Sequence, residues 1–221
     1  MPLADFRSPR LFVDARLSAG AYIALERGQA NYLGNVLRLG AGDAVLVFNG
    51  RDGEWRAAIT GGKRADRLDI VARTRPQDSL PDLAYVFAPL KHARLDYMVQ
   101  KAVEMGAATL QPVVTRHTQV SRVNLERMRA NVIEAAEQCG ILSIAAVDAP
   151  QPLERYLAGR DPARLLVFCD EAAEVAAPVA ALGDGARGGG IDVFDGPAGG
   201  FSEAERAALL KQPRVERLSL A

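Results

Sequence analysis

The stretch Ile191-Asp-Val-Phe-Asp-Gly-Pro-Ala-Gly-Gly-Phe-Ser202 decides how the rest of the chain is interpreted. It begins as a β-branched and aromatic run, passes through a loop with three glycines, and reaches Ser202, a favourable helix N-cap. Glu203 and Glu205 follow in the first helical turn, where the helix macrodipole favours negative charge. The pattern predicts a strand, a tight glycine loop and a helix. In an open α/β sheet, ligands bind where such loops leave the carboxyl ends of strands.

The glycine loop lacks the motifs of common nucleotide and hydrolase sites. The chain has no G-x-G-x-x-G, no G-x-x-x-x-G-K-[ST] and no G-x-S-x-G. Pro197 stiffens the loop, and the acidic pair after it would repel a phosphate. Without Cβ atoms, Gly196, Gly199 and Gly200 let a ligand approach the backbone closely. The loop is either a plain β-to-α turn or a site for an adenosine or amino-acid moiety.

Composition indicates a folded protein without metal or membrane signals. Hydrophobic residues make up 49% of the 221 residues, and no apolar run reaches the length of a membrane span. The N-terminus lacks the apolar core of a signal peptide, so we expect a cytoplasmic protein. Cys139 and Cys169 lie in periodic segments and are expected to be buried free thiols. His92 and His117, with no cysteine pair nearby, argue against a zinc site.

Charge is unevenly distributed although the net charge is zero. Residues 1–75 hold 12 Lys or Arg and 8 Asp or Glu, and residues 91–130 hold 7 and 3. Residues 131–221 hold 8 basic and 14 acidic residues. The asymmetry is compatible with ordinary surface variation, and it also favours an anionic partner for the basic regions.

Residues 1–75 predict a small β-barrel. Apolar runs closed by glycine turns indicate strands at 10–13, 21–25, 44–48, 55–60 and 68–72, and helical spacing indicates a helix over 29–39. Such barrels often bind nucleic acid, and guanidinium groups suit phosphate contacts. The candidate side chains are Arg7, Arg10, Arg38, Arg51 and Arg56. We single out Arg10, because Pro9 fixes the entry into its strand.

Beyond a proline-bounded linker at residues 74–81, the pattern changes to alternating strands and helices. Strands are predicted at 83–90, 110–114, 144–147, 165–169, 191–195 and 215–220. Helices are predicted at 95–105, after Asn124, at 152–157, at 174–182 and after Ser202. This alternation predicts right-handed βαβ units and a mainly parallel sheet.

Two helical faces carry acidic and amide side chains spaced four residues apart. They are Asp96, Gln100 and Glu104 on the first helix, with Lys101, and Glu134 and Gln138 on the second, with Glu137. Each face is either an ordinary solvated surface with ion pairs or, if desolvated, a source of proton acceptors.

Several motifs together resemble one known family. They are Asn35-Val-Leu-Arg-Leu39 with Gly42-Asp43, Phe48-Asn-Gly50, Leu90-Lys91 with Asp96, Gln100-Lys-Ala-Val-Glu-Met-Gly106, Glu134-Ala-Ala-Glu-Gln-Cys-Gly140 and Gly196-Pro-Ala-Gly-Gly-Phe-Ser202. In this order and spacing they resemble the bacterial 16S ribosomal RNA (uracil-N3) methyltransferases of the SPOUT superfamily. The resemblance covers nearly the whole chain.

The resemblance implies a PUA-like β-barrel RNA-binding domain at residues 1–75 and a SPOUT methyltransferase domain at 82–221. The second domain would hold a mainly parallel sheet with a trefoil knot. The family forms homodimers, uses S-adenosylmethionine and methylates N3 of one uridine in 16S ribosomal RNA of the small subunit. It needs no metal and no membrane.

The resemblance also implies roles for individual residues. The methyl donor would be bound by Gly196, Pro197, Gly199, Gly200, Leu218 and Leu220. RNA phosphates would be held by Arg10, Lys91, Arg94 and Lys101, an interaction that weakens steeply with salt. The uracil base must leave its stack, and its N3 must lose a proton. The candidate proton acceptors are Glu104 and Glu137, with Gln138 orienting.

The chain departs from the family pattern at several positions. Ala198 and Asp195 stand where the family usually has a glutamate and an aliphatic residue, and Ile141 stands where arginine is common. The sequence stops at Ala221, before the Gly-Pro-Arg turn and final helix that complete the knot in the family. These departures favour an alternative, a catalytically impaired RNA- or ribosome-binding homologue. A flavodoxin-like nucleotide-binding enzyme is a more distant alternative.

Overall fold

The computed structural model describes residues 8–61, 66–120, 122–173 and 189–219. The chain divides into two compact units, one of residues Met1–Ser79 and Ile133–Ile144, the other of Leu80–Val132 and Ala145–Ala221. Sequence patterning assigns residues 133–144 to the C-terminal region, whereas the structure groups them with the N-terminal unit.

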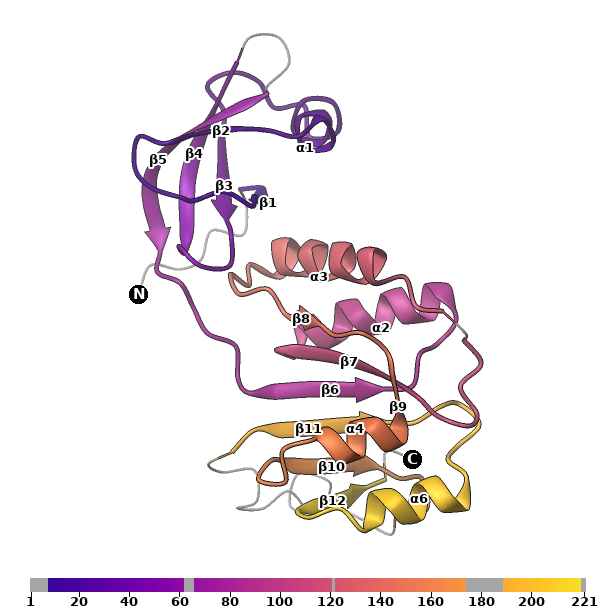
Figure 1. The fold of residues 1–221 in the computed structure, drawn as a ribbon. Coiled ribbons are helices and arrows are strands. Elements are labelled where there is room, and N and C mark those ends of the chain that lie inside the picture. Colours follow the sequence, from indigo (N-terminus) through magenta and orange to yellow (C-terminus); the bar gives the residue numbers. More distant parts are fainter. Residues whose placement is uncertain (1–7, 62–65, 121, 174–188, 220–221) are drawn as a thin grey trace. The chain divides into compact units, whose positions relative to one another are not determined.

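The N-terminal unit is built on a five-stranded sheet with the order β1-β3-β4-β5-β2 (Figure 1). Its strands are β1 (Arg10–Phe12), β2 (Tyr22–Ala24), β3 (Ala44–Phe48), β4 (Glu54–Thr60) and β5 (Arg67–Arg75). β1 pairs with β3 in parallel, and the other pairs are antiparallel. β3 and β4 are consecutive strands and form an antiparallel hairpin.

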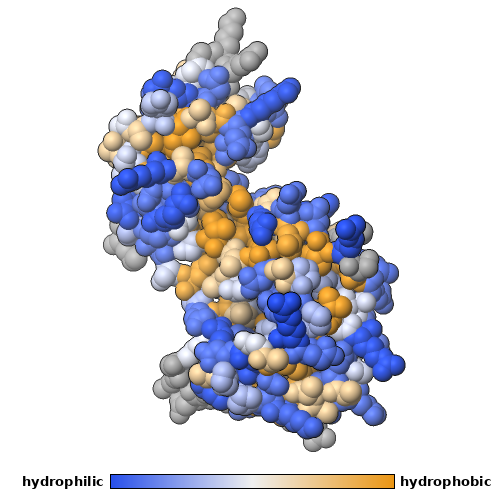
Figure 2. Space-filling view, viewed as in Figure 1, coloured by the Kyte–Doolittle hydropathy of each residue, from blue (hydrophilic) through white to orange (hydrophobic). Residues whose placement is uncertain are grey.

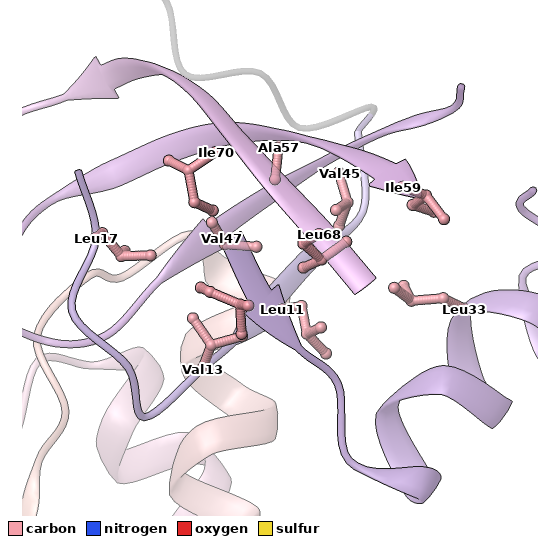
Figure 3. Close-up of a cluster of buried hydrophobic side chains, with 11 residues drawn as sticks. Leu11, Val13, Leu17, Leu33, Val45, Val47, Ala57, Ile59, Leu68 and Ile70 are labelled. Carbon is pink, nitrogen blue, oxygen red and sulfur yellow. The ribbon is translucent and has the colours of Figure 1, made fainter. Parts of the chain in front are cut away.

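Alternate side chains of this sheet form an apolar core (Figure 3). Val45 and Val47 of β3 point into it with Ala57 and Ile59 of β4. Leu33 packs against it from the helical segment, which consists of α1 (Arg27–Asn31) and a π-helical turn, η1 (Tyr32–Val36). The helix predicted over 29–39 therefore exists but ends earlier, because Arg38 adopts a left-handed conformation with φ 58°.

Residues 133–144 join the N-terminal unit through a second apolar cluster. Ala136 and Leu142 pack with Phe48, which also meets the Phe12 ring edge-on at 5.8 Å. The Arg75 guanidinium donates a 2.9 Å hydrogen bond to the Gly140 carbonyl. These contacts are long-range in sequence, so periodicity along the chain does not reveal them.

The C-terminal unit contains a parallel sheet with the order β12-β10-β11-β6-β7-β8, and β9 pairs with β7 (Figure 1). Its strands are β6 (Leu83–Phe87), β7 (Thr109–Val114), β8 (Ala146–Val147), β9 (Gln151–Pro152), β10 (Leu165–Cys169), β11 (Ile191–Asp195) and β12 (Val215–Leu218). Every described pairing in this sheet is parallel, which confirms the predicted sheet.

Among the described helices, α2 (His92–Glu104), α4 (Leu153–Gly159) and α6 (Glu203–Leu210) belong to the C-terminal unit. α3 (Leu125–Cys139) begins in this unit and ends in the N-terminal unit. α4 and α6 bury Leu153, Tyr156 and Leu209 against Phe168 and Phe194 of the strands. The helix predicted over 174–182 lies outside the described residues, and the trefoil knot stays a prediction.

Across the described residues, the structure has no helix with both the length and the apolar character needed to cross a bilayer. On the face of the molecule shown in Figure 2, hydrophilic residues are spread over both units, interrupted by smaller hydrophobic areas.

Candidate functional site

The glycine loop, residues 196–201, connects β11 to α6 as predicted. It closes through a 2.8 Å hydrogen bond from the Gly200 amide to the Pro197 carbonyl, and Gly200 has φ 70°, a value that favours glycine. Ser202 and Glu205 form a capping box at the start of α6, where the Ser202 side chain accepts a hydrogen bond from the Glu205 amide. The loop is therefore fixed at its helix end.

Gly196 is required by packing within the loop. A Cβ atom at this position would lie 2.4 Å from the Phe201 ring. That ring stacks on Phe194 at 5.4 Å and meets Phe168 edge-on at 5.2 Å, so it has little room to move. Gly199 differs, because a Cβ there would come no closer than 3.6 Å to His117.

A cleft of about 330 Å³ opens at the carboxyl ends of β10 and β11. We call it the first cleft. It is lined by residues 169–172 after β10, by 195–197, 200 and 201 of the glycine loop region, and by Arg206 of α6. Its volume falls in the range of small-molecule sites, and its position is where ligands bind in open α/β sheets.

Asp170 anchors one side of the first cleft. Its buried carboxylate accepts hydrogen bonds from Arg206 at 2.9 Å, from Arg217 at 2.8 Å and from the Ala172 amide at 3.1 Å. Burial by itself raises the pKa of Asp170, but these hydrogen bonds together lower it below its ordinary value. The carboxylate and the two arginines therefore hold α6, β12 and the β10 loop together.

Asp195 stands at the other side, where the carboxylate accepts a 2.9 Å hydrogen bond from the Tyr85 hydroxyl. Burial, followed by the charge of Asp195, raises the pKa of Tyr85. Burial also raises the pKa of the Cys169 thiol to about 11, with a further contribution from Asp195. Cys169 is thus an unreactive thiol at neutral pH.

The chemistry of the first cleft suits a cationic ligand with hydroxyl groups. The cleft is lined by the carboxylates of Glu171 and Asp195, whereas the third carboxylate, Asp170, is already paired with Arg206 and Arg217. A polyphosphate would be repelled, whereas an amino or sulfonium group would be attracted and ribose hydroxyls could donate to carboxylates. S-adenosylmethionine has these groups, so the residues present fit this cofactor.

A second loop, which follows β7, contacts the glycine loop. The Nδ1 atom of His117 lies 3.0 Å from the Gly200 carbonyl oxygen. The Arg116 amide donates a 2.6 Å hydrogen bond to Glu205. Sequence reasoning considered His117 only as a zinc ligand and missed this contact. The available signal was the position of Arg116 and His117 within three residues of the end of β7, a strand that ends at the same edge of the sheet.

The structure brings together some, but not all, of the residues expected to bind the methyl donor. Gly196, Pro197 and Gly200 line the first cleft, while Gly199 lies on the same loop beside His117. Leu218 is buried in a separate apolar cluster with Leu165 and Val167, and its carbonyl accepts a hydrogen bond from the Asp170 amide. Leu220 lies outside the described residues.

The expected catalytic residues belong to different units. Glu104 is on α2 in the C-terminal unit and pairs with Lys101 at 2.6 Å. Glu137 is on α3 in the N-terminal unit, where its carboxylate accepts a 2.8 Å hydrogen bond from the Phe12 amide. Burial raises the pKa of Glu137, and the hydrogen bond from the Phe12 amide offsets only part of this increase. Gln138 is exposed on α3.

Of the expected RNA ligands, Arg10 requires a correction. Its guanidinium is 3% exposed and pairs with Glu54 at 2.8 Å, and Arg75 binds the same carboxylate. A buried guanidinium that compensates a buried carboxylate is not available to RNA phosphates, so Arg10 has a structural role. The sequence around Pro9 and Arg10 contains no local signal for this burial, because the partner Glu54 lies 44 positions away.

The other expected RNA ligands lie at or beside α2. Lys91 precedes the helix and is exposed, and Arg94 is exposed in its first turn. Lys101 pairs with Glu104 and its ammonium lies 5.5 Å from the centre of the Tyr97 ring. Both cysteines were expected to be buried, but Cys139, at the end of α3, is exposed and Cys169 is half-buried.

The face of α2 that carries Arg94 and Lys101 also borders an apolar groove, which we call the α2 groove. It has a volume of about 850 Å³ and runs between α2 and strands β6 and β11. Tyr97 and Met105 line it with exposed fractions of 63% and 82%, although both are large hydrophobic residues. Within the described ranges, no cluster of three or more His, Cys, Asp or Glu side chains could hold a metal ion.

Comparison with known protein families identifies two regions. The model for an RNA methyltransferase domain matches residues 77–221, more than half of the chain. The model for an RNA methyltransferase PUA domain matches residues 25–68.

Individual relatives extend over both regions. The ribosomal RNA small subunit methyltransferase E of Rickettsia conorii is 26% identical over 213 residues, which cover 96% of this chain and 86% of the relative. The protein of the same name from Synechocystis is 31% identical over 153 residues, covering 67% of this chain and 50% of the relative.

Solved structures share the fold. The ribosomal RNA small subunit methyltransferase E of Neisseria gonorrhoeae, solved with S-adenosylmethionine, has a TM-score of 0.81 and 21% identity, covering 97% of this chain and 90% of the other. A protein of Legionella pneumophila, also solved with S-adenosylmethionine, has a TM-score of 0.82, 22% identity and the same coverage.

Proposed function

This chain belongs to the RNA methyltransferase family, and we propose that it transfers the methyl group of S-adenosylmethionine to N3 of a uridine in 16S ribosomal RNA. The observation that supports this most directly is the first cleft, where the glycine loop and three carboxylates meet at the carboxyl ends of β10 and β11. The names of the relatives from Rickettsia conorii and Synechocystis point to the small ribosomal subunit.

The residues of the first cleft bind and orient the methyl donor. When bound, S-adenosylmethionine supplies an electrophilic methyl group. The glycine loop presents its backbone to the ligand, and the carboxylates of Glu171 and Asp195 favour its positive charges and its ribose hydroxyls. Most of the lowering of the barrier comes from placing donor and acceptor in line, because a fixed geometry removes the entropic cost of the encounter.

The acceptor nitrogen must lose its proton for the reaction to proceed. A carboxylate whose pKa is raised toward neutrality is better suited to accept it than an ordinary one. Of the two candidates, Glu137 has a raised pKa owing to burial, whereas Glu104 is engaged with Lys101. Both remain candidates for the proton acceptor, Glu137 because of its raised pKa and Glu104 because it lies in the same unit as the first cleft, with Gln138 as the orienting group.

Exposed cations of the C-terminal unit hold the RNA substrate. Lys91 and Arg94 are exposed at the beginning of α2, where they can contact phosphates. Lys101 shares its charge with Glu104 and contributes less. The substrate is the 16S ribosomal RNA or the assembled small subunit, which places the protein in the cytoplasm.

The active species is a homodimer in which a second copy covers the α2 groove. Exposed apolar patches of several hundred square ångströms usually mark interaction surfaces, and Tyr97 and Met105 give this groove such a character. A second copy is the occupant favoured by the family resemblance.

The function is tested by mass-spectrometric analysis of nucleosides from small-subunit RNA. Cells that lack the gene should lose 3-methyluridine at one site, and expression of the 221-residue chain should restore it. Isothermal titration should show binding of S-adenosylmethionine to the purified chain. Unchanged 3-methyluridine in the deletion strain would contradict the proposal.

A specific departure favours a second candidate, a homologue that binds RNA without catalysis. Ala198 replaces the glutamate usual at this position of the glycine loop, and it is exposed. A missing carboxylate there would weaken the hold on the donor. In this case the purified chain would bind ribosomal RNA in a salt-sensitive way but would transfer no methyl group.

A further inference from the structure

A second cleft, of about 390 Å³, lies at the carboxyl end of β6 in the C-terminal unit. It is formed by the start of α2, the start of α3 and the connection between β7 and α3. Neither the family comparisons nor the expected donor site accounts for it. Its lining differs from that of the first cleft, because basic side chains outnumber acidic ones.

The charges at the second cleft do not cancel. Asp96 accepts hydrogen bonds from the Arg127 guanidinium at 3.0 Å and from the Asn131 amide at 2.8 Å, so Asp96 and Arg127 compensate each other. Lys91 and Arg122 also line the cleft and are exposed. Within the part of the chain that the structure describes, neither side chain has an ion-pair partner. The cleft therefore carries two uncompensated positive charges.

The floor of the second cleft is apolar. Leu95 and Met128 line it with exposed fractions of 7% and 1%. At its rim, the Asn124 side-chain oxygen accepts a 3.0 Å hydrogen bond from the Arg127 amide, which leaves the Asn124 amide group as a donor. A cationic rim over an apolar floor matches a nucleotide, whose phosphate is anionic and whose base has a flat apolar face.

The second cleft is joined to the first by a few residues of one loop. His117 contacts the Gly200 carbonyl, and Arg116 binds Glu205 through its amide. Gln119 and Val120 follow after Thr118 in the sequence and line the second cleft. Both clefts therefore lie along the carboxyl edge of the same sheet, where a strand of RNA could contact one while its target base reaches the other.

We propose that the second cleft binds a nucleotide of the RNA substrate, with its phosphate at Lys91 and Arg122 and its base or ribose over Leu95 and Met128. The proposal rests on the proposed function, since it assumes that the chain acts on RNA. It adds Arg122, Asn124 and the apolar floor to the substrate site, and it separates RNA binding from donor binding within one unit.

The test compares two double variants with the same loss of charge. Lys91→Ala with Arg122→Ala removes the two cations of the cleft. Arg155→Ala with Lys211→Ala is the control, because both residues are exposed in the same unit and neither lines the cleft. Binding of a 16S ribosomal RNA fragment is measured by fluorescence anisotropy over a range of salt concentrations, and binding of S-adenosylmethionine by calorimetry.

The cleft variant should bind RNA about tenfold or more weakly than wild type, as expected for the loss of two charge-assisted contacts. The slope of log affinity against log salt should fall in magnitude by about 0.7, which corresponds to one phosphate contact on a single strand. The control should stay within about twofold of wild type, and donor binding should be unchanged in both. An equal loss of RNA affinity in the two double variants would overturn the proposal.

A second measurement uses the wild-type chain and needs no variant. A fragment carrying 4-thiouridine is cross-linked by light, and the modified peptides are identified by mass spectrometry. Cross-links should map to residues 90–96 or 122–128, and their absence from both segments would overturn the proposal. If wild type binds no methyl donor while the RNA results above hold, the proposed function fails and the RNA cleft stands.

Discussion

The Nδ1 atom of His117 lies 3.0 Å from the carbonyl oxygen of Gly200, two residues separated by 83 positions in the sequence. A carbonyl oxygen only accepts hydrogen bonds, so Nδ1 carries the proton and donates it. The contact ties the loop after β7 to the glycine loop after β11. It does so beside the first cleft, where the proposed donor binds.

Replacing His117 with Ala removes this hydrogen bond between the two loops. We expect the affinity for S-adenosylmethionine to fall about fivefold, the equivalent of one neutral hydrogen bond, while the stability of the exposed site changes little. His117→Asn should recover part of the affinity, since an amide can donate to the same carbonyl. Calorimetric titration of the three proteins checks this, and equal affinities would show that the contact does not position the glycine loop.

Replacing Gly196 with Ala should destabilise the glycine loop. The added Cβ would lie 2.4 Å from the Phe201 ring, which is held between Phe168 and Phe194. Overpacking of this kind costs about 1–3 kcal/mol. Urea unfolding measures the free-energy change. Gly199→Ala is the matched control, because its Cβ would meet no atom closer than 3.6 Å, and it should unfold at nearly the wild-type midpoint.

Replacing Asp170 with Asn should lower stability in a pH-dependent way. The pKa of Asp170 is depressed in the folded protein, so its charged form contributes stability above the ordinary Asp pKa. This contribution is lost as the pH falls through the pKa that Asp170 has in the folded protein. At pH 7 the variant should be about 1–3 kcal/mol less stable than wild type, with two arginines losing a charged partner. Unfolding experiments between pH 7 and pH 3 should show the difference shrinking, and a constant difference would contradict this assignment.

Replacing Glu137 with Gln separates a catalytic from a structural role. Gln keeps an acceptor for the Phe12 amide but cannot take up a proton. If Glu137 accepts the N3 proton, methyl transfer should fall about a hundredfold or more with donor binding unchanged. A variant with wild-type turnover would return the role to Glu104.

The same substitution has a predictable effect on the pH dependence of stability. The folded pKa of Glu137 is raised, so its contribution to stability is complete below the ordinary Glu pKa and is lost as the pH rises through the folded value. Glu137→Gln should therefore gain stability relative to wild type on going from pH 4 to pH 7. Thermal unfolding at the two pH values measures this change.

Replacing Met105 with Glu should disrupt the proposed dimer. Met105 is 82% exposed on the α2 groove, and a charge there would have to be desolvated on association. Light scattering coupled to size exclusion should show monomers at micromolar concentrations. The control is Val71→Glu, at a position 54% exposed on β5 of the other unit, and it should leave the dimer intact. Dimers in both variants would exclude the α2 groove as the interface.

Local patterns in the sequence were enough to identify most of the elements and the class of fold. Apolar alternation, helical spacing and the capping signal at Ser202 are local, so they identified α2, α3, α6 and the strands of both sheets except β9 to within a few residues. The sequence signals for the glycine loop, and for its position between a strand and a helix, were also local. The motifs were sufficient to indicate the family. Patterns along the chain carry this information because backbone geometry depends on near neighbours.

The roles of individual side chains became apparent from the three-dimensional fold. Arg10 looked like a surface cation, but the fold buries it against Glu54, 44 positions away. His117 showed no partner in the sequence, yet it contacts Gly200, and residues 133–144 group with the N-terminal unit although they follow the predicted boundary. The pairing of a charge and the burial of a face depend on residues brought together from distant parts of the chain, and no local pattern specifies them.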